Sequence, residues 1–447
     1  MSRRTLIRWS IAASVALGVS RSRLLEILER TSGKGVAFAA AESSATRLVV
    51  LACGNGGLSH FQLFWPQIDV ARAHDPRFAW HRIGDERMVE GTDLPLAVGP
   101  DTPWASLSGD RQITGFVCGA TETHVRNVQS TSILNGSNVF AIATVLQSPS
   151  TALIPAVTIG DAQLGTANNA ATAVNVDSVD SFIKLFDSAA SQTGGLLHDS
   201  VDAGLFGDQY RVLRELNRAS GRSNQKPVYA VAARAANYLG MNRASQLQIM
   251  PADLARYGID GNTRGNVAEL ARALIVTAKA FQTDLTNAVL IPTMTDDPHL
   301  HFENGAVDVV PGQLRVVLDA FMADLAAPEP SIDNATLADN VVIAINGDTP
   351  KHCLVREDWP DNTPGNANLM FIYSAGYLKS GWFGGIDRRG NVQGAGADGK
   401  PTAYNGAMTA RFATASLAYA IARGNERRIA QYANGVAVGN AFGRNRG

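Results

Sequence analysis

The feature that most constrains this chain is the alternation of short apolar runs with longer amphipathic segments along its length. A continuous apolar run of about four to eight residues is typical of a strand buried on both faces, whereas apolar residues spaced three and four apart are typical of a helix. The pattern predicts strands within residues 46–53, 114–120, 156–160, 287–294, 340–346 and 368–376.

The clearest helical pattern covers residues 265–285, where one face carries Val267, Leu270, Leu274, Phe281 and Leu285. At its start, Asn266 and the acidic Glu269 three residues later predict a capping box, in which each side chain accepts from the other residue's backbone N–H. Similar spacing and glycine stops predict helices within residues 178–191, 208–221, 312–325 and 408–424.

Apolar strands that alternate with amphipathic helices predict an α/β fold with a mainly parallel sheet sandwiched between helices. The sequence after residue 41 has no internal repeat and no long linker, so residues 42–447 are predicted to form a single domain. Ligands of such sheets bind at the carboxyl ends of the strands. The segments that follow the predicted strands are therefore the places to look for a functional site.

Residues 1–41 read as an export signal of the twin-arginine type, with Arg3 and Arg4 ahead of the apolar run WSIAASVALGV. The alternative is an ordinary secretory signal in which the arginine pair occurs by chance. The small-residue stretch VAFAAAES offers a cleavage site near Ala39 to Ala41. The apolar run is about half of the ~20 residues that a membrane span needs, so we expect an exported, periplasmic or extracellular protein without a stable span.

Charge and cysteine content exclude two classes of site. Lys and Arg total 39 against 40 Asp and Glu, for a net charge of -1, so no basic excess points to a nucleic-acid partner. The three cysteines, Cys53, Cys118 and Cys353, form no C-x-x-C pair, which argues against a cysteine-ligated zinc site. Whether two of them form a disulfide is left open by the sequence.

The first candidate segment is CGNGGLSH, directly after the first predicted strand. Successive backbone N–H groups of Gly54, Asn55, Gly56 and Gly57 are expected to bind an anion, and Ser59 is the nearest hydroxyl that could act as a nucleophile. The glycine spacing fits neither a dinucleotide fingerprint nor a P-loop. The alternative interpretation is a tight turn with no ligand.

The second candidate segment is TDDPHLHF, which follows the predicted strand 287–294. If this segment is extended, Asp297, His299 and His301 face the same side, because alternate side chains of an extended chain share a face. A carboxylate beside imidazoles suits zinc or another divalent ion, with His301 as a ligand or a proton carrier. The alternative is a polar loop whose histidines are solvated.

Two further segments are weaker candidates. The stretch HCLVREDWPD, after the predicted strand 340–346, contains acidic and imidazole groups that either complete a metal site or cap turns: His352, Glu357, Asp358 and Asp361. His124 follows the strand 114–120, but a single histidine is more often structural than functional.

Taken in order, these motifs resemble those of a widespread family of exported bacterial proteins of unassigned function, sulfatase-like relatives within the alkaline phosphatase superfamily. The resemblance covers most of the chain after the signal, and it is carried by the order of the motifs: the arginine pair, CGNGG, DDPH, the helix LRVVLDAFMADL, REDWP and AGYLKSGWFGGID. It implies a parallel sheet between helices, with one or two metal ions at the strand exits.

Residue by residue, the resemblance is incomplete. Family members typically read G-G-N-D-G after the first strand, and Gly56 here occupies the aspartate position. They read W-D-T-H after the middle strand, where Asp297 and His299 match. Their later loop often carries D-H, where Glu357 takes the acidic position and Asp358 replaces the histidine. The resemblance thus implies Asp297, His299, Glu357 and Asp358 as metal ligands.

These observations lead to two main hypotheses. The first is a metal-dependent hydrolase of phosphate or sulfate esters, holding zinc, calcium or magnesium. The second is a non-catalytic, secreted binding or assembly protein without metal, favoured by Gly56 at the aspartate position. A third hypothesis uses Trp382 and Phe383 as a carbohydrate-stacking platform, although such aromatic side chains more often pack in a core. The expected partner is a small-molecule ester or a secreted protein, and the sequence leaves the oligomeric state open.

Overall fold

The computed structural model of the chain describes residues 46–54, 57–58, 63–64, 86–87, 96–97, 103–104, 112–118, 133–134, 136–147, 152, 154–162, 164–168, 170, 173–187, 208–209, 211–212, 215, 243–295, 309–327, 336–347, 367–386, 391–395, 400–433 and 441. The predicted signal segment, residues 1–41, lies outside the described residues.

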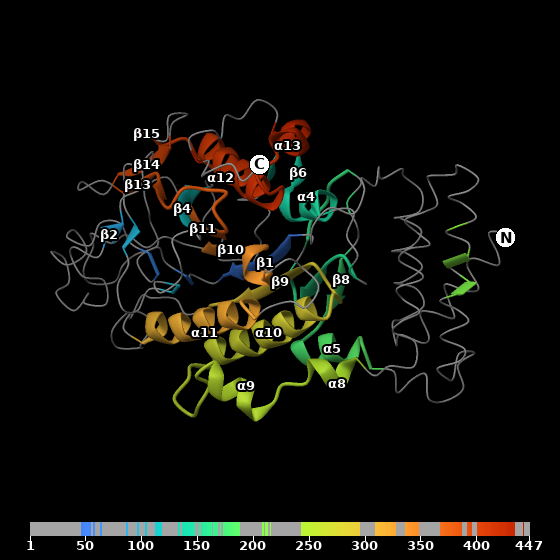
Figure 1. Cartoon of the computed structure of the whole chain (residues 1–447). Helices are drawn as coiled ribbons and strands as arrows, with labels where there is room; N and C mark the ends of the chain where they lie inside the picture. The colour runs from blue at the N-terminus through green and yellow to red at the C-terminus, as the bar shows by residue number, and fades with distance from the viewer. Residues whose placement is uncertain are drawn as a thin grey trace.

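An eight-stranded sheet forms the centre of the molecule (Figure 1), with the strand order β12-β4-β11-β10-β1-β9-β7-β8. In that order, the strands span Gly381–Phe383, Gln112–Cys118, Asn368–Ser374, Val341–Gly347, Arg47–Cys53, Ala288–Thr293, Val157–Ile159 and Val174–Val176. β1 pairs in parallel with β10 and β9, and the pairs β9–β7, β7–β8 and β4–β12 are also parallel. β11 is antiparallel to both of its neighbours, β10 and β4. The predicted mainly parallel sheet is confirmed, with β11 as the one reversed strand of this sheet.

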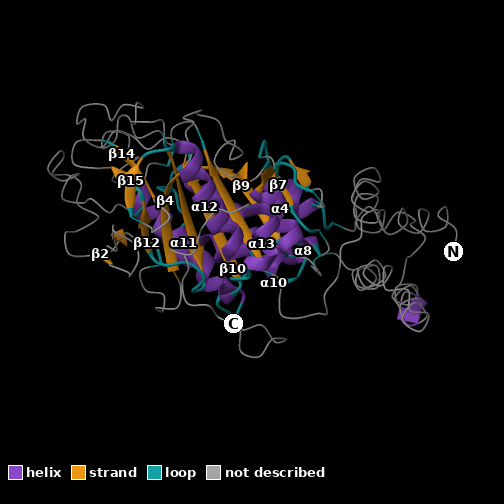
Figure 2. Cartoon of the chain, turned by 90° about the horizontal axis from the view of Figure 1, so that it is seen from above, coloured by secondary structure: helices purple, strands orange, loops and turns teal. Residues whose placement is uncertain are grey.

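Helices cover both faces of the sheet, as the α/β prediction requires: α10 (Gly265–Gln282) and α11 (Val310–Leu325) on one face, and α4 (Val139–Leu146) and α12 (Gly406–Ile421) on the other. Figure 2, seen from the α12 side, shows the strands crossing beneath that helix. Alternate residues of β1 belong to two separate apolar cores, so the whole strand is buried. This two-sided burial explains why the central strands read as continuous apolar runs.

The C-terminal ends of α12 and α4 lie where β1 begins. Thr46, just before β1, donates a side-chain hydrogen bond of 3.0 Å to the carbonyl of Ile421, the last residue of α12. Gln147, directly after α4, donates through Nε2 to the carbonyl of Thr46 at 2.7 Å. Both helices therefore run opposite to the parallel strands, and their N-terminal ends point toward the edge of the sheet where those strands end. We call this edge the carboxyl edge, and the opposite one the amino edge.

Helices α10 and α11 have the same orientation. The buried Arg47, the first residue of β1, forms an ion pair of 2.9 Å with Asp284, which follows α10, and its guanidinium lies 5.9 Å from the centre of the Phe281 ring. At the end of α10, Gln282 donates to the carbonyl of Asp324, near the end of α11, at 2.9 Å. The C-terminal ends of both helices thus lie at the amino edge.

The capping box predicted from Asn266 and Glu269 is wrong. Helix α10 begins at Gly265, before Asn266, and its N-cap is Arg264, which makes no side-chain cap hydrogen bond. Instead, the backbone N–H of Arg264 donates to the Gln313 side chain of α11 at 3.1 Å. A contact with the neighbouring helix therefore replaces the local cap that the sequence predicted.

Smaller elements complete the described fold. The helices are α5 (Val179–Lys184), α8 (Ala244–Leu247), α9 (Pro251–Arg256), α13 (Glu426–Ala433) and the 3-10 turn η5 (Leu337–Asp339). The remaining strands pair as β2 (Glu86–Arg87) with β3 (Leu96–Ala97), β5 (Ile133–Leu134) with β6 (Ser137–Asn138), and β13 (Gly385–Ile386) with β14 (Val392–Ala395) and then β15 (Pro401–Ala403). The predicted helices 312–325 and 408–424 are confirmed as α11 and α12, while α4, β8 and β12 were not predicted.

The stacking-platform hypothesis is wrong for Trp382 and Phe383, because both side chains are buried. The Trp382 indole N–H donates to the carbonyl of Phe64 at 2.8 Å, and its ring meets Phe371 edge-on with centroids 5.3 Å apart. Phe383 stacks on Phe116 at 5.3 Å. These rings hold β12 against the sheet and offer no face to a sugar. No helix in the described part of the chain is both long and apolar enough to cross a membrane.

Candidate functional site

The strands that lead into the three main candidate segments are direct neighbours in the sheet. β1 lies between β9 and β10 and is parallel to both. In register, Cys53 at the end of β1 pairs with Thr293 at the end of β9, and Ala52 pairs with Asn346 near the end of β10. The glycine-rich segment, the Asp-x-His segment and the acidic loop therefore all leave the sheet at its carboxyl edge, from adjacent strands.

The glycine-rich segment after β1 is described only at its two ends, Gly54 and Gly57. The backbone N–H of Gly57 donates to the carbonyl of Gly54 at 3.2 Å, which closes a four-residue turn directly after β1. Asn55 and Gly56, between these glycines, lie outside the described residues. Their predicted contacts with an anion, like those of Gly54 and Gly57, stay a prediction.

The chain that leaves this turn passes over the end of β10. A Cβ atom added to Gly347, the last residue of β10, would lie 2.5 Å from the backbone oxygen of Leu58 and 2.6 Å from the Leu369 side chain. Only glycine fits there without displacing a neighbour. The exit of β1 and the exit of β10 are thus in direct backbone contact, which couples the first candidate segment to the third.

The other candidate residues lie outside the described residues, namely Ser59, His124, Asp297, His299, His301, His352, Glu357, Asp358 and Asp361. The structure does describe the strand ends from which their segments start. In the chain, Asp297 is four residues beyond Thr293, the last residue of β9. The segment 348–366 leaves β10 and returns to β11, and Gly347 pairs with Leu369. Both ends of the acidic loop therefore lie at the carboxyl edge.

Buried polar side chains that the sequence reasoning missed are found at this edge. Thr293 is 6% exposed and Asn368, the first residue of β11, is 5% exposed. Within the described part of the chain, neither Thr293 Oγ1 nor Asn368 Oδ1 has a hydrogen-bond partner. Asn346, 2% exposed, lies nearby on β10. In the sequence, each of these residues appears only as a polar residue at one end of an otherwise apolar run. That pattern alone does not distinguish a ligand contact from the end of a strand.

The electrostatic environment of the carboxyl edge favours negative charge. The N-terminal ends of α4, α10, α11 and α12 point toward it, as their C-terminal contacts at the amino edge require. Each helix N-terminus carries about half a positive elementary charge, together with backbone N–H groups that lack helical partners. The helices on both faces of the sheet thus have the orientation that favours an oxyanion bound close to one of their N-terminal ends.

Cys118, one of two described cysteines at this edge, is not a reactive thiolate. Cys118, at the end of β4, is a free, fully buried thiol, and burial raises its pKa far above the usual range. It pairs with Asn368 in the sheet. Cys53 packs in the core on the α10 side and Cys118 in the core on the α12 side, so these two cysteines are not bonded to each other. Cys353 lies outside the described residues.

Among the described residues, no group of three or more His, Cys, Asp or Glu side chains is arranged to hold a metal ion. All four predicted metal ligands, Asp297, His299, Glu357 and Asp358, fall outside those residues, so the metal prediction is not tested by this observation.

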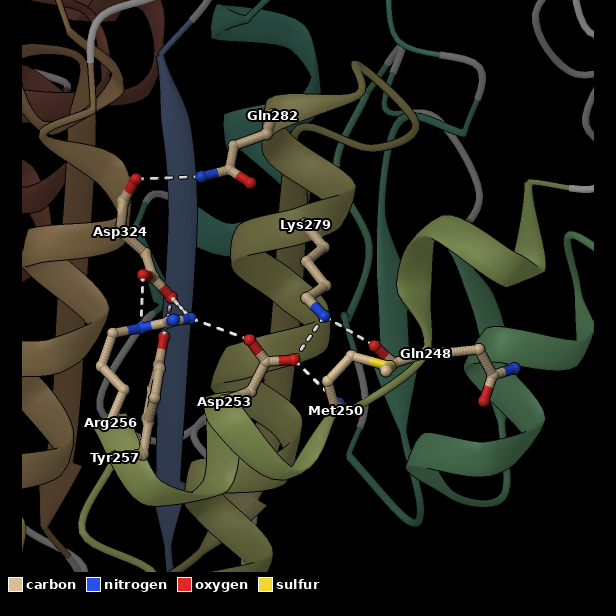
Figure 3. Close-up of polar contacts among 8 residues, drawn as sticks. All are labelled: Gln248, Met250, Asp253, Arg256, Tyr257, Lys279, Gln282 and Asp324. Atoms are coloured by element: carbon tan, nitrogen blue, oxygen red, sulfur yellow. Dashed lines mark hydrogen bonds and ion pairs between the residues drawn. The ribbon is translucent and has the colours of Figure 1, made fainter.

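A network of charged side chains joins α9 to α10 and α11 near the amino edge (Figure 3). Arg256 bridges Asp253 at 3.0 Å and Asp324 at 2.9 Å, while Tyr257 donates to Asp324 at 2.8 Å. Lys279 forms an ion pair with Asp253 at 2.5 Å. Each charge has a protein partner, and the network lies at the end of the sheet opposite the strand exits. We therefore interpret it as a structural clamp.

The clamp makes stability depend on pH in acid. Burial raises the pKa of Asp253, but hydrogen bonds from Lys279, the Met250 backbone and Arg256 outweigh it, so the pKa is lowered overall. Because the folded pKa is below the unfolded one, the stabilisation is present above ~pH 4 and is lost as pH falls through the folded pKa.

We expect Asp253→Asn to lower the free energy of unfolding at pH 7 by about 1–3 kcal/mol. Urea unfolding at pH 7 and pH 3 measures this: the difference between the two proteins should shrink at pH 3, and an unchanged difference would contradict the assignment.

Comparisons with family models, with curated proteins and with solved structures find no match to this chain. The fold that the structure shows is α/β with a mostly parallel sheet. The resemblance to sulfatase-like proteins that the motifs carry stays a proposal.

Proposed function

We propose that this protein is an exported hydrolase of phosphate or sulfate esters with an alkaline-phosphatase-like fold, and that it acts with a divalent metal ion at the carboxyl edge of its sheet. The observation that carries the proposal is the strand order β9-β1-β10. This order starts the segments with Asp297 and His299, with the glycine turn and with Glu357 from neighbouring strands that end at one edge.

The donor set fits a divalent ion. His299 supplies an imidazole, and Asp297, Glu357 and Asp358 supply carboxylates, a mixture that zinc accepts and that magnesium or calcium accepts with fewer imidazoles. A bound ion would polarise the ester and lower the pKa of a coordinated water or hydroxyl group.

The protein's own groups would bind the oxyanion, attack the ester and transfer the proton. Backbone N–H groups of the Gly54–Gly57 turn, assisted by the helix N-terminal ends, would hold the ester oxyanion. Ser59, two residues beyond the turn, is the hydroxyl proposed to attack the phosphorus or sulfur, with cleavage of the bond from that atom to the ester oxygen of the leaving alcohol. His301 is proposed to carry the serine proton to that alcohol, and water would then hydrolyse the serine ester to release phosphate or sulfate.

The test is metal analysis of the protein after export in a bacterial host, combined with hydrolysis of p-nitrophenyl phosphate and p-nitrophenyl sulfate. We expect about one or two zinc, magnesium or calcium ions per chain, and hydrolysis of at least one ester that EDTA abolishes and metal restores. A folded protein that holds no divalent ion and hydrolyses neither ester would overturn the proposal and favour the non-catalytic binding protein.

A further inference from the structure

Thr293 presents a buried hydroxyl at the centre of the carboxyl edge. It is the last residue of β9 and is 6% exposed, yet among the described residues its Oγ1 has no hydrogen-bond partner. Leaving a buried hydroxyl unsatisfied is unfavourable, so a native protein that retains one usually has a use for it. A valine would occupy nearly the same volume and suit a buried strand better.

The position of Thr293 indicates that use. It pairs with Cys53, the last residue of β1, and the Gly54–Gly57 turn begins at the residue after Cys53. Thr293 is also four residues before Asp297, the first proposed metal ligand. Thr293 thus lies beside the strand end that leads into the proposed oxyanion-binding turn, and in the chain it shortly precedes the proposed metal-binding segment.

We infer that Thr293 is a ligand-binding residue, whose hydroxyl donates a hydrogen bond to an oxygen of a bound phosphate or sulfate group. This inference rests on the proposed function and adds a residue to the proposed site. A hydroxyl is suited to this role because it donates to an oxyanion without adding charge beside the metal. A bound oxyanion would supply the partner that Oγ1 lacks among the described residues.

A second buried hydroxyl provides a matched comparison. Ser374, at the end of β11, is fully buried, and its Oγ also lacks a hydrogen-bond partner among the described residues. Because β11 is antiparallel to β10, Ser374 lies at the amino edge. It therefore shares the unsatisfied chemistry of Thr293 but lies at the opposite end of the sheet from the proposed site.

The experiment compares the wild-type protein, Thr293→Val, Thr293→Ser and Ser374→Ala by thermal unfolding, with and without inorganic phosphate or orthovanadate. In the absence of oxyanion we expect Thr293→Val and Ser374→Ala each to unfold about 1–3 °C higher than wild type, because each removes an unsatisfied group. With phosphate, we expect Thr293→Val to lose most of the stabilisation, its Kd rising roughly tenfold or more. Thr293→Ser should recover binding, and Ser374→Ala should bind as wild type does.

The outcomes separate the two claims. If Thr293→Val binds phosphate and vanadate as tightly as wild type while wild type hydrolyses esters, Thr293 does not contact the oxyanion and this inference is wrong, although the proposed function stands. If wild type neither hydrolyses esters nor gains stability from either oxyanion, the proposed function and this inference fall together. If Thr293→Val unfolds at a higher temperature than wild type but binds phosphate equally well, the hydroxyl is not a ligand contact and the inference is overturned.

Discussion

Asp297→Ala is expected to release the bound metal and to lower kcat/KM for p-nitrophenyl phosphate or sulfate by on the order of a thousandfold or more. Substituting even an outer-shell partner of a metal ligand costs about 10- to 100-fold, so loss of a direct carboxylate ligand should exceed that. After identical dialysis of both proteins, we expect about one or two bound metal ions per chain in wild type and nearly none in Asp297→Ala. Metal analysis and steady-state kinetics on the same preparation measure both effects.

Asp177→Ala is the matched control for this substitution. Asp177 directly follows β8 and is exposed, so it is also an aspartate at a strand exit on the carboxyl edge. β8 is separated from β1 by β7 and β9, which places Asp177 away from the proposed site. We expect this variant to keep its metal and its activity. Full metal content and full activity in Asp297→Ala would remove Asp297 from the site and end the metal-hydrolase proposal as stated.

Gly347→Ala is expected to have the second-largest effect, although the added group is one methyl. The new Cβ would lie 2.5 Å from the Leu58 backbone oxygen, which is far inside the contact distance and cannot be relieved by a side-chain rotation. The segment that leaves the Gly54–Gly57 turn must therefore move. We expect a loss of about 1–3 kcal/mol in the free energy of unfolding and a fall in kcat/KM of about a hundredfold, since a shift of about 1 Å in catalytic groups has effects of that size.

Gly261→Ala tests whether any glycine substitution has this effect. A Cβ at Gly261 would meet nothing within 4 Å, and the residue is exposed in the loop before α10. Thermal unfolding and ester hydrolysis should be close to wild type in this variant. If Gly347→Ala were also close to wild type in both measurements, the contact between the β1 and β10 exits would not position the proposed site.

Much of the secondary structure could be predicted from local pattern, because burial of a strand or helix face imposes a regular spacing of apolar residues. The runs RLVVLAC, AVLIPT and VVIAING all became central strands, since each is covered by helices on both faces. The amphipathic spacing of apolar residues within 265–285 and 312–325 likewise identified α10 and α11. The cap at Asn266 failed because Gln313, on another helix, supplies the contact instead.

The short elements were harder to predict. β8 and β12 are strands of three residues at the two margins of the sheet, too short for alternation or an apolar run to identify. The reversal of β11 was also beyond the sequence pattern. A strand buried on both faces looks the same in either direction, and β11 is as fully buried as β10, the antiparallel neighbour beside it.

For the candidate site, the sequence by itself determined which residue types are available: a glycine turn after the first strand, an aspartate and histidines after another, and carboxylates in a later loop. Only the tertiary structure decided that the three strands are neighbours in the order β9-β1-β10 and that Gly347 meets Leu58. It also decided that Thr293 is buried with a hydroxyl that finds no partner in the described part of the chain. The physical reason is that residue spacing reports on burial and backbone geometry within about ten residues. Strand order and close backbone contacts depend on how segments far apart in the chain share one core, a global balance that no local pattern records.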